Sequence, residues 1–437
     1  MAAVHLEPQR ETPVVEEADV VVCGGGPAGV TAAIAAARVG AKTRLLELHG
    51  CLGGIWTAGL LSWIIDARGK PGFIQELYRE LERRGAAASR PTRDPKDVET
   101  FRDFACDPEA LKGVLDDLTV AAGVRLRLHT RVVAAAVKDG RLDLAITESS
   151  SGREAWRAKV FVDATGNGDL ADRAGCTWEY GREDGHAQPM SLIAVLAGVR
   201  FQDLRPFVGG GWTPDSKKNL LAEMKRAGFE PSYHDPVIFR VYDDLFILMS
   251  NHEYRVSGLN ADDVTRATID ARKEVQMQVA RLRALGNDVW NDLRLVATGA
   301  QIGIREGRRV RGLYRVTVDD LVKGARFDDA VCRVTFNIDV HSPNPDKSKG
   351  YDHGGQRAQP YDIPYRALIA RDVNGLLTAG RCISGDFLAH SSYRVTGNAV
   401  ALGEAAGVAA AVAAKTDRLP QEVPWPEIAE ALKKIRR

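Results

Sequence analysis

The distribution of apolar positions near the start of the chain predicts a strand, a helix and a second strand. Residues 20–23 form an unbroken apolar run, which is typical of a buried parallel strand. Residues 28–39 are rich in alanine and predict a helix that ends at Gly40. A second apolar run covers 43–46. Because a strand, a helix and a strand in this order form a crossover unit, we expect a parallel sheet here.

Helical and extended patterns continue well beyond this unit. Apolar positions at helical spacing predict helices over 71–86 and 108–122, and Asp107 is a suitable N-cap for the second. An extended stretch follows, and then a hairpin that returns to a strand at 161–164. We assign these elements to one α/β domain, in which 66–106 is a helical insertion.

The composition changes after Trp178, where proline, tryptophan and tyrosine become more frequent. Two short apolar runs at 237–241 and 245–249 predict strands. An amphipathic pattern over 261–285 predicts a long helix that stops at Gly286. The chain then returns to apolar and alanine-rich patterns like those of its first part.

These patterns predict two domains. Residues 18–178 and 365–415 form a discontinuous α/β domain that is Rossmann-like, with a parallel central sheet. Residues 179–364 form an inserted α+β substrate or cap domain, and residues 1–17 form a flexible N-terminus.

The turn after the first strand has the spacing G-x-G-x-x-G. Its glycines permit a tight turn, a close approach of the backbone to a pyrophosphate, and close packing of the next helix. A carboxylate at the end of the second strand suits the ribose hydroxyls of an adenosine. The dinucleotide-binding residues predicted here are Gly24, Gly26, Pro27, Ala28, Gly29 and Glu47. The motif itself does not distinguish NAD from FAD, and the chain contains one such unit.

Composition and charge limit the ligands and the cellular compartment that we expect. The net charge of +1 gives no electrostatic case for binding nucleic acid or an anionic membrane. None of the six cysteines forms a C-x-x-C pair, so we expect no redox dithiol and no zinc or iron–sulfur site. The first residues lack the apolar core of a signal peptide, and we see no run long enough to span a bilayer. We therefore expect a cytoplasmic protein with reduced thiols.

Three separated motifs together resemble one superfamily. The stretches VVVCGGGPAGVTAAIAAARVGAKTRLLE, VFVDATGNGDLA and LLTAGRCISGDF are similar, in order and spacing, to the two-dinucleotide-binding-domain flavoproteins of the glutathione-reductase-like superfamily. Within it, LLELHGCLGGIWTAGL and GRCISGDFLAHSSYRVTGNAVALGEAAGVAAA resemble the FAD-dependent oxidoreductases. The resemblance covers most of 18–415, with a poorly matched middle at about 180–290. It implies that the cofactor is FAD.

The resemblance also implies roles for particular residues. The pyrophosphate would lie on the first glycine motif, and the ribose on Glu47. Further FAD contacts would come from Gly53, Gly54, Val133, Ala164, Thr165, Gly166, Asp386, Asn398 and Ala399. Among these, Asp386 would bind the ribityl chain or a phosphate-linked water, and Asn398 and Ala399 would face the flavin pyrimidine. The superfamily often has arginine where this chain has Cys51, so one cationic phosphate contact is expected to be missing.

Candidates for the chemistry come from the later part of the chain. His341, in NIDVHSPN, is the first choice for a base, and the alternative is a loop histidine with a structural role. Arg305, in GIREGRR, is either a substrate or flavin contact or part of a surface ion pair. His390 either touches substrate or caps a helix. Arg366 and Arg394 are candidates to clamp a carboxylate, although a domain-tying role fits Arg366 better.

We therefore expect a dehydrogenase or oxidase that passes a hydride from a C–OH or C–NH carbon of a small polar substrate to FAD, with oxygen or an unidentified acceptor completing the cycle. One alternative is an enoate or fumarate-type reductase. Another is an FAD-carrying subunit that works with a partner redox protein. Self-association into a homo-oligomer is left open.

Overall fold

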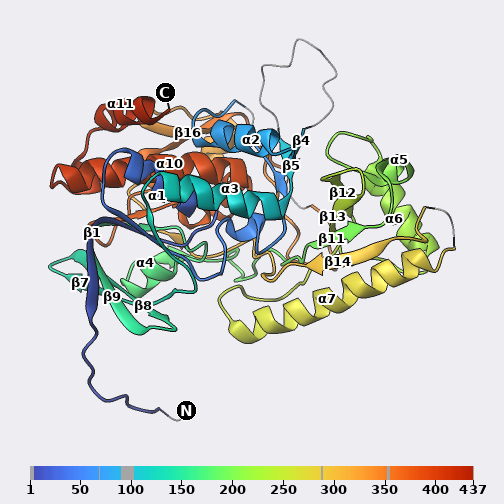
Figure 1. Ribbon diagram of the computed structural model, residues 1–437, viewed down its shortest axis with the longest axis horizontal. Coiled ribbons are helices and arrows are strands. Elements are labelled where there is room, and N and C mark those ends of the chain that lie inside the picture. The colour runs from blue at the N-terminus through green and yellow to red at the C-terminus, as the bar shows by residue number, and fades with distance from the viewer. Residues whose placement is uncertain (1–3, 68, 90–102, 287–288, 352–354, 437) are drawn as a thin grey trace.

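A mixed sheet forms the centre of the computed structural model, which describes residues 4–67, 69–89, 103–286, 289–351 and 355–436 (Figure 1). Seven strands lie in the order β6-β2-β1-β9-β8-β7, with β18 paired to β9. Their bounds are β1 Val14–Cys23, β2 Thr43–Leu46, β6 Arg125–Arg127, β7 Arg131–Lys138, β8 Arg141–Ser149, β9 Gly152–Asp163 and β18 Leu376–Thr378.

Parallel pairing dominates the middle of this sheet. β1 pairs in parallel with β2 and with β9, and β18 and β6 extend the parallel part at its two sides. β7, β8 and β9 pair antiparallel. The carboxyl ends of the parallel strands therefore meet at one edge, which is where ligands bind in sheets of this type. The α/β fold with a parallel central sheet is confirmed.

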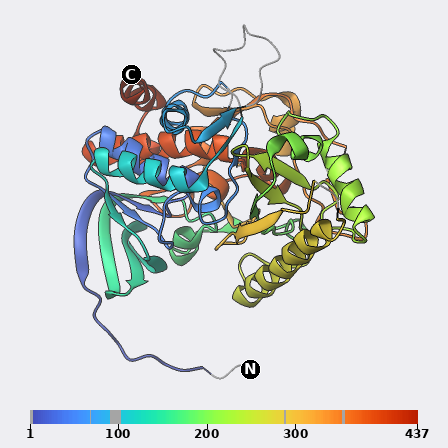
Figure 2. The same ribbon diagram turned by 45° about the vertical axis from the view of Figure 1, so that its right-hand side comes forward.

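Helices α1 (Pro27–Arg38), α3 (Pro108–Ala121) and α10 (Thr396–Lys415) run side by side over the sheet (Figures 1 and 2). α10 is long and apolar enough to cross a membrane by length and composition, contrary to the expectation from the sequence. Since 94% of its apolar window is buried inside the protein, it serves as a core helix here. Asp107 caps α3, as predicted, by accepting from Glu109 N at 2.8 Å.

A second, antiparallel sheet lies beside the first part, in the order β12-β13-β11-β14. Its strands are β11 Ala194–Ala197, β12 Val237–Arg240, β13 Leu245–Met249 and β14 Arg294–Thr298. Helices α6 (Ser216–Arg226) and α7 (Ala261–Arg283) share one apolar core with this sheet. The predicted strands and the long helix of the cap are thus present, and α7 ends two residues before the predicted end.

The remaining elements connect the two parts. They are β3 Trp63–Ile64, α2 Phe73–Arg83, β4 Ala87–Ser89, β5 Phe104–Cys106, α4 Asp169–Arg173, β10 Trp178–Glu179, α5 Phe201–Leu204, β15 Arg309–Val310, α8 Val318–Lys323, β16 Ala330–Val334, β17 Tyr361–Pro364, α9 Phe387–Tyr393 and α11 Trp425–Ile435.

Three expectations differ from the structure. β1 begins at Val14, so 14–17 are part of the sheet and not of a flexible N-terminus, because this stretch pairs with β9. The insertion at 66–106 contains short strands as well as a helix, and its polar loop lies outside the described residues. Apolar residues from 316 to 363, within the predicted cap, pack into the core around α1 and α10.

Candidate active site

The loop between β1 and α1 forms a cradle for an anionic group. Gly24 has φ +96°, and a Cβ there would lie 2.4 Å from the Ala164 carbonyl oxygen. A Cβ on Gly29 would lie 1.7 Å from the Gly24 carbonyl oxygen, so α1 approaches the strand closely. A Cβ on Gly26 would meet no atom within 4 Å. Gly26 therefore faces open space at the helix N-terminus, where N–H groups attract phosphate.

Glu47 lies buried at the end of β2 and faces this loop. Its Oε1 accepts from His49 N at 2.7 Å, and its Oε2 accepts from Gly25 N. These backbone donors hold the carboxylate in place. Because each carboxylate oxygen has two lone pairs, both oxygens keep acceptor capacity for the hydroxyls of a ribose.

The second glycine pair packs against the first motif. Gly53 N donates to Gly25 O at 2.8 Å, and Gly53 and Gly54 both have positive φ. A Cβ on Gly54 would lie 3.0 Å from Gly26 Cα. Both glycine loops thus border one space, and the Cys51 thiol turns toward the Thr57 hydroxyl, 3.7 Å away.

Two more predicted FAD contacts have a backbone that suits them. The β7–β8 register shifts between Val132 and Ala134, which places Val133 at an irregularity of the strand pairing, and its contact with the adenine stays a prediction. Asp163 Oδ1 shapes the turn at 164–166 by accepting from Thr165 N at 3.0 Å and Thr165 Oγ1 at 2.7 Å. Burial raises the pKa of Asp163. The sequence analysis did not single out this aspartate, although it lies in the quoted VDATG stretch.

The predicted flavin contacts near the C-terminus divide into two kinds. Asp386 caps α9 through Ala389 N and also accepts from Val318 N, both within 2.8 Å. Its ribityl contact stays a prediction beside this structural role. Asn398, in the first turn of α10, is buried, and its Nδ2 has no hydrogen-bond partner among the described residues. Ala399 is buried next to it.

Arg381, which the sequence analysis missed, also lies at this edge. A Cβ on Gly166 would lie 2.4 Å from Arg381 Nη2, so the guanidinium packs directly on the turn after β9. It donates to Ile304 O, and burial lowers its pKa. Glycine at 166 is therefore needed to admit a cation beside the dinucleotide cradle.

A cluster of polar side chains surrounds His341. The His341 Nδ1 lies 3.0 Å from His252 Nε2, and its Nε2 lies 3.4 Å from Asp339 Oδ2. The backbone N–H of His341 donates to Gln188 Oε1 at 3.0 Å. Burial and the nearby Arg305 lower the pKa of His341 to about 3. The imidazole is therefore neutral at neutral pH and able to accept a proton.

The hydrogen-bond chain behind His341 assigns its tautomer. Tyr254 Oη donates to Ser232 O at 3.0 Å, so it accepts from His252 Nδ1, 3.1 Å away. His252 Nε2 then has no proton and accepts from His341 Nδ1. Burial keeps His252 neutral by lowering its pKa well below the usual value. This leaves the lone pair of His341 on Nε2, on the side of Asp339.

Two arginines stand beside these histidines. Arg305 Nη1 donates to Pro189 O at 2.6 Å and to Ser191 Oγ at 2.9 Å. Arg394 Nη2 donates to Asp339 O at 2.8 Å and to its Oδ2 at 3.2 Å. Burial and the neighbouring Arg394 lower the pKa of Arg305 to about 10, yet Arg305 keeps some accessible surface.

Asp339 is the carboxylate of this cluster. Burial alone would raise its pKa, but His341 when protonated, together with Arg394 and Arg305, holds the pKa well below the usual range. The carboxylate is therefore ionised. It can stabilise a positive charge that forms on the His341 ring.

The alternative in which the GIREGRR stretch forms an ion pair on the surface is wrong. Glu306 is 1% exposed, and it accepts from Gln188 N at 2.7 Å and from Arg309 Nη1 at 2.8 Å. Arg309 is buried as well. Arg305 lies on the same stretch and is partly buried, and its contact with substrate or flavin stays a prediction.

His390 and Arg366 lie elsewhere. His390 is fully buried next to Tyr393, and neither ring nitrogen makes a hydrogen bond of normal geometry within the described ranges, so the ring caps no helix. Burial and Arg309 lower its pKa well below the usual value. Arg366 is half-exposed and bonds to Asp329 at 2.9 Å, which fits a tie between segments and not a substrate clamp.

Several members of the cluster escaped the sequence analysis. They are Gln188, Tyr233, His252, Tyr254, Asp339 and Tyr351, and most lie in or near the stretch that matched the family poorly. Tyr233 packs its ring 4.1 Å from that of His252 and shares a hydrogen bond of 2.8 Å with the Tyr351 hydroxyl. The NIDVH motif was the one usable signal, because it carries Asp339 two residues before His341.

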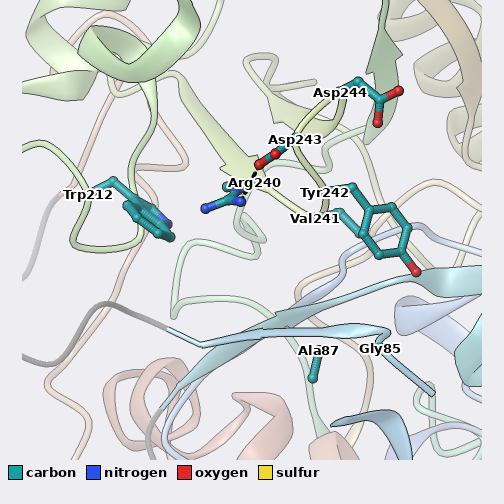
Figure 3. Close-up of a pocket in the computed structure, with 8 residues that line it drawn as sticks. All are labelled: Gly85, Ala87, Trp212, Arg240, Val241, Tyr242, Asp243 and Asp244. Atoms are coloured by element: carbon teal, nitrogen blue, oxygen red, sulfur yellow. Dashed lines mark hydrogen bonds and ion pairs between the residues drawn. The ribbon is translucent and has the colours of Figure 1, made fainter. Parts of the chain in front are cut away.

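A separate hollow of about 520 Å³ lies where the β12–β13 turn meets the β4 region (Figure 3). Arg240 and Asp243 point toward each other there and form an ion pair (Figure 3). Tyr242 Oη donates to Asp107 Oδ2 at 2.9 Å. This hollow is lined by none of the predicted site residues.

Comparison with known proteins gives the family. Residues 19–432 match the family described as FAD dependent oxidoreductase. The enzyme MnmG of Helicobacter pylori, described as a tRNA uridine 5-carboxymethylaminomethyl modification enzyme, is 31% identical over 106 residues, 21% of this chain and 17% of that protein. Dihydrolipoyl dehydrogenase of Trypanosoma brucei brucei is 55% identical over 46 residues, 10% of each chain. The matched segments thus span a small part of these relatives.

The chain also resembles solved structures of flavoenzymes, at low sequence identity. The myxobacterial chondrochloren halogenase CndH is 14% identical, with 96% of this chain and 79% of that chain covered and a TM-score of 0.49. The p-nitrophenol 4-monooxygenase PnpA of Pseudomonas putida is 12% identical, with 97% and 85% covered and a TM-score of 0.48.

This chain belongs to the FAD-dependent oxidoreductase family, and it is therefore an enzyme that uses FAD. The residues present fit that cofactor. Gly26 has open space at the start of α1, backbone donors fix the Glu47 carboxylate, and Asn398 Nδ2 has no partner among the described residues, so each of these groups is able to contact a dinucleotide.

Proposed function

We propose that this FAD-dependent oxidoreductase is a dehydrogenase or oxidase of a small polar substrate with a C–OH or C–NH carbon. FAD, when bound, accepts the hydride that leaves this carbon. The observation that carries the proposal is the buried His341, whose Nδ1 lies 3.0 Å from His252 Nε2 and whose Nε2 lies 3.4 Å from Asp339 Oδ2.

Each side chain of the cluster has a separate role in the proposed reaction. His341 Nε2 takes the proton from the O–H or N–H of the substrate. Asp339, 3.4 Å from this nitrogen, stabilises the imidazolium that results. His252 and Tyr254 hold the ring in the tautomer that leaves Nε2 free. Burial of the cluster excludes water, which would compete for the proton.

The test is anaerobic bleaching of the bound flavin by a panel of alcohols, hydroxy acids, amines and sugars. We expect at least one member to bleach it, and His341→Gln to slow that reduction by about a hundredfold or more, the range of general-base catalysis. His186→Gln is a matched control, because His186 also lies 3.4 Å from a carboxylate but is 55% exposed. Equal rates in His341→Gln and the parent would overturn the role of this base.

The same experiment distinguishes the alternatives. If no compound bleaches the flavin but the reduced enzyme is reoxidised by enoates, the protein is a reductase of that class. If neither occurs until another redox protein is added, the chain is an FAD-carrying subunit. Either result would replace the proposed direction of hydride transfer and leave the family assignment intact.

A further inference from the structure

Two buried donors beside His341 have nothing to bind within the described part of the chain. They are Arg394 Nε and Gln188 Nε2. The two side chains touch, because Arg394 Nη2 donates to Gln188 Oε1 at 3.2 Å. Gln188 Oε1 also accepts from His341 N at 3.0 Å, so the amide is oriented with its nitrogen as the free end. Buried donors are rarely left unsatisfied, so a ligand acceptor is expected here.

One charged side chain of the cluster, Arg305, also lacks an oppositely charged partner within the described ranges. Asp339 accepts from Arg394, and Glu306 accepts from Arg309. Arg305 donates to Pro189 O, Ser191 Oγ and, weakly at 4.0 Å, Met249 Sδ, all of which are neutral. With both histidines neutral, the Arg305 guanidinium makes no hydrogen bond or ion pair to a carboxylate among the described residues. A buried charge of this kind needs a counter-ion.

We propose that the substrate carries a carboxylate, which accepts from Arg394 Nε and Gln188 Nε2 and balances the charge of Arg305. This inference rests on the proposed function and names its substrate class. A singly charged, planar group suits the Arg305 cation and donors on two touching side chains.

The test is binding to the FAD-loaded enzyme. Acetate, propionate and benzoate are titrated while the visible spectrum of the flavin is followed, with acetamide, propionamide and benzamide as matched neutral probes. Sodium chloride at equal ionic strength controls for salt. We expect the acids to perturb the spectrum at concentrations at least tenfold lower than the amides, since an anion gains charge-assisted hydrogen bonds.

Variants locate the binding. Arg394→Met and Gln188→Leu are each expected to weaken the binding of the acids about tenfold or more, with little change for the amides. Arg366→Met is the control, because this arginine bonds to Asp329 away from the cluster. If Arg394→Met fails to fold or to hold FAD, Gln188→Leu decides. Equal binding of acids and amides, or unchanged acid binding in the deciding variant, overturns the proposal.

The binding test and the bleaching test can fail independently of each other. Acids that bind through Arg394 while no compound bleaches the flavin would overturn the proposed oxidation and support the carboxylate site. Bleaching by neutral alcohols or amines, with no preference for acids, would support the proposed oxidation and overturn the carboxylate site. If both variants hold FAD more weakly but, once saturated with FAD, keep the parent's ratio of acid to amide binding, these donors belong to the flavin and the proposal is overturned.

Discussion

At the scale of single residues, the dinucleotide cradle contains two kinds of glycine. Gly24 has φ +96° and no room for a Cβ, which would lie 2.4 Å from the Ala164 carbonyl oxygen. Gly26 has φ −67°, a value that any residue adopts, and a Cβ there would meet no atom within 4 Å. The protein itself therefore needs glycine at 24, whereas at 26 the need comes from the cofactor.

Gly26→Ala is accordingly expected to fold like the parent and to lose FAD. The added methyl group occupies the space at the start of α1, so we expect FAD affinity to fall about tenfold or more, as from a steric clash of a few kcal/mol. The measurement is flavin absorbance per protein after incubation with FAD, with circular dichroism to verify folding. Gly24→Ala, by contrast, is expected to yield little folded protein. Parent-like FAD binding by Gly26→Ala would place the pyrophosphate elsewhere.

The tautomer of His341 depends on a hydroxyl that does not touch it. In Tyr254→Phe the His252 Nδ1–H loses its acceptor, so His252 is free to change tautomer and His341 Nε2 is then protonated part of the time. We expect flavin reduction to slow about tenfold, the worth of one hydrogen bond, with unchanged FAD content. Stopped-flow reduction across a range of pH is the measurement.

A control separates this effect from general destabilisation. Tyr314→Phe removes a hydroxyl of similar kind, which donates to Asp320 at 2.9 Å far from the histidines. It should leave the reduction rate and its pH profile as in the parent. If Tyr254→Phe and Tyr314→Phe behave alike, the hydrogen-bond chain does not set the tautomer of His341.

At the scale of elements, the close packing of α1 against α10 holds the cradle on the sheet. A Cβ on Gly403 or Gly407 of α10 would lie 2.1 Å from the carbonyl oxygen of Ala28 or Ala32. Both glycines face α1, four residues apart, as one turn of helix requires. The alanine-rich composition of both helices allows the same close approach along their length.

Gly407→Ala is therefore expected to destabilise the protein although alanine is the better helix former. Backbone must move to admit the methyl group, at a cost of about 1–3 kcal/mol. Gly113→Ala is the matched control within α3, where the nearest atom to the new Cβ would be Arg84 Nη1 at 3.5 Å. That change should stabilise by up to about 1 kcal/mol. Thermal melting of both FAD-loaded variants is the measurement, and a parent-like Gly407→Ala would contradict the packing.

The elements also show what a sequence can predict. The first crossover unit, the cap of α3 by Asp107 and the length of α7 depend on residues close together in the chain, and they were predictable. His252 and His341 are 89 residues apart and meet only after folding. No local pattern marks such a pair. For the same reason, the packing of 316–363 into the main core gave no signal in periodicity or composition.

At the scale of the whole molecule, three histidines of the described residues lie in the interior, two of them in contact with each other and the third, His390, next to Tyr393. His252, His341 and His390 are each at most 4% exposed. Burial, reinforced by neighbouring arginines, lowers the pKa of each below the usual value of histidine. The folded protein thus keeps three neutral imidazoles that the unfolded chain would protonate in mild acid.

Stability should therefore fall as the pH falls below about 6.5, the histidine pKa of the unfolded chain. The contribution of these residues is fully present above that pH, and each removes about 1.4 kcal/mol per pH unit below it, because only the unfolded state binds the proton. The half-buried Glu253, whose pKa is raised to about 7 by burial, acts in the opposite direction between pH 7 and pH 5, so the histidine contribution is read from the difference in the melting-temperature curve between a histidine variant and the parent, both loaded with FAD. His390→Gln should flatten the curve by one proton, whereas His186→Gln, at an exposed position, should leave its slope unchanged. Parallel curves for His390→Gln and the parent would mean that His390 takes up its proton in the folded protein, and that the interior tolerates a further positive charge beside the arginines.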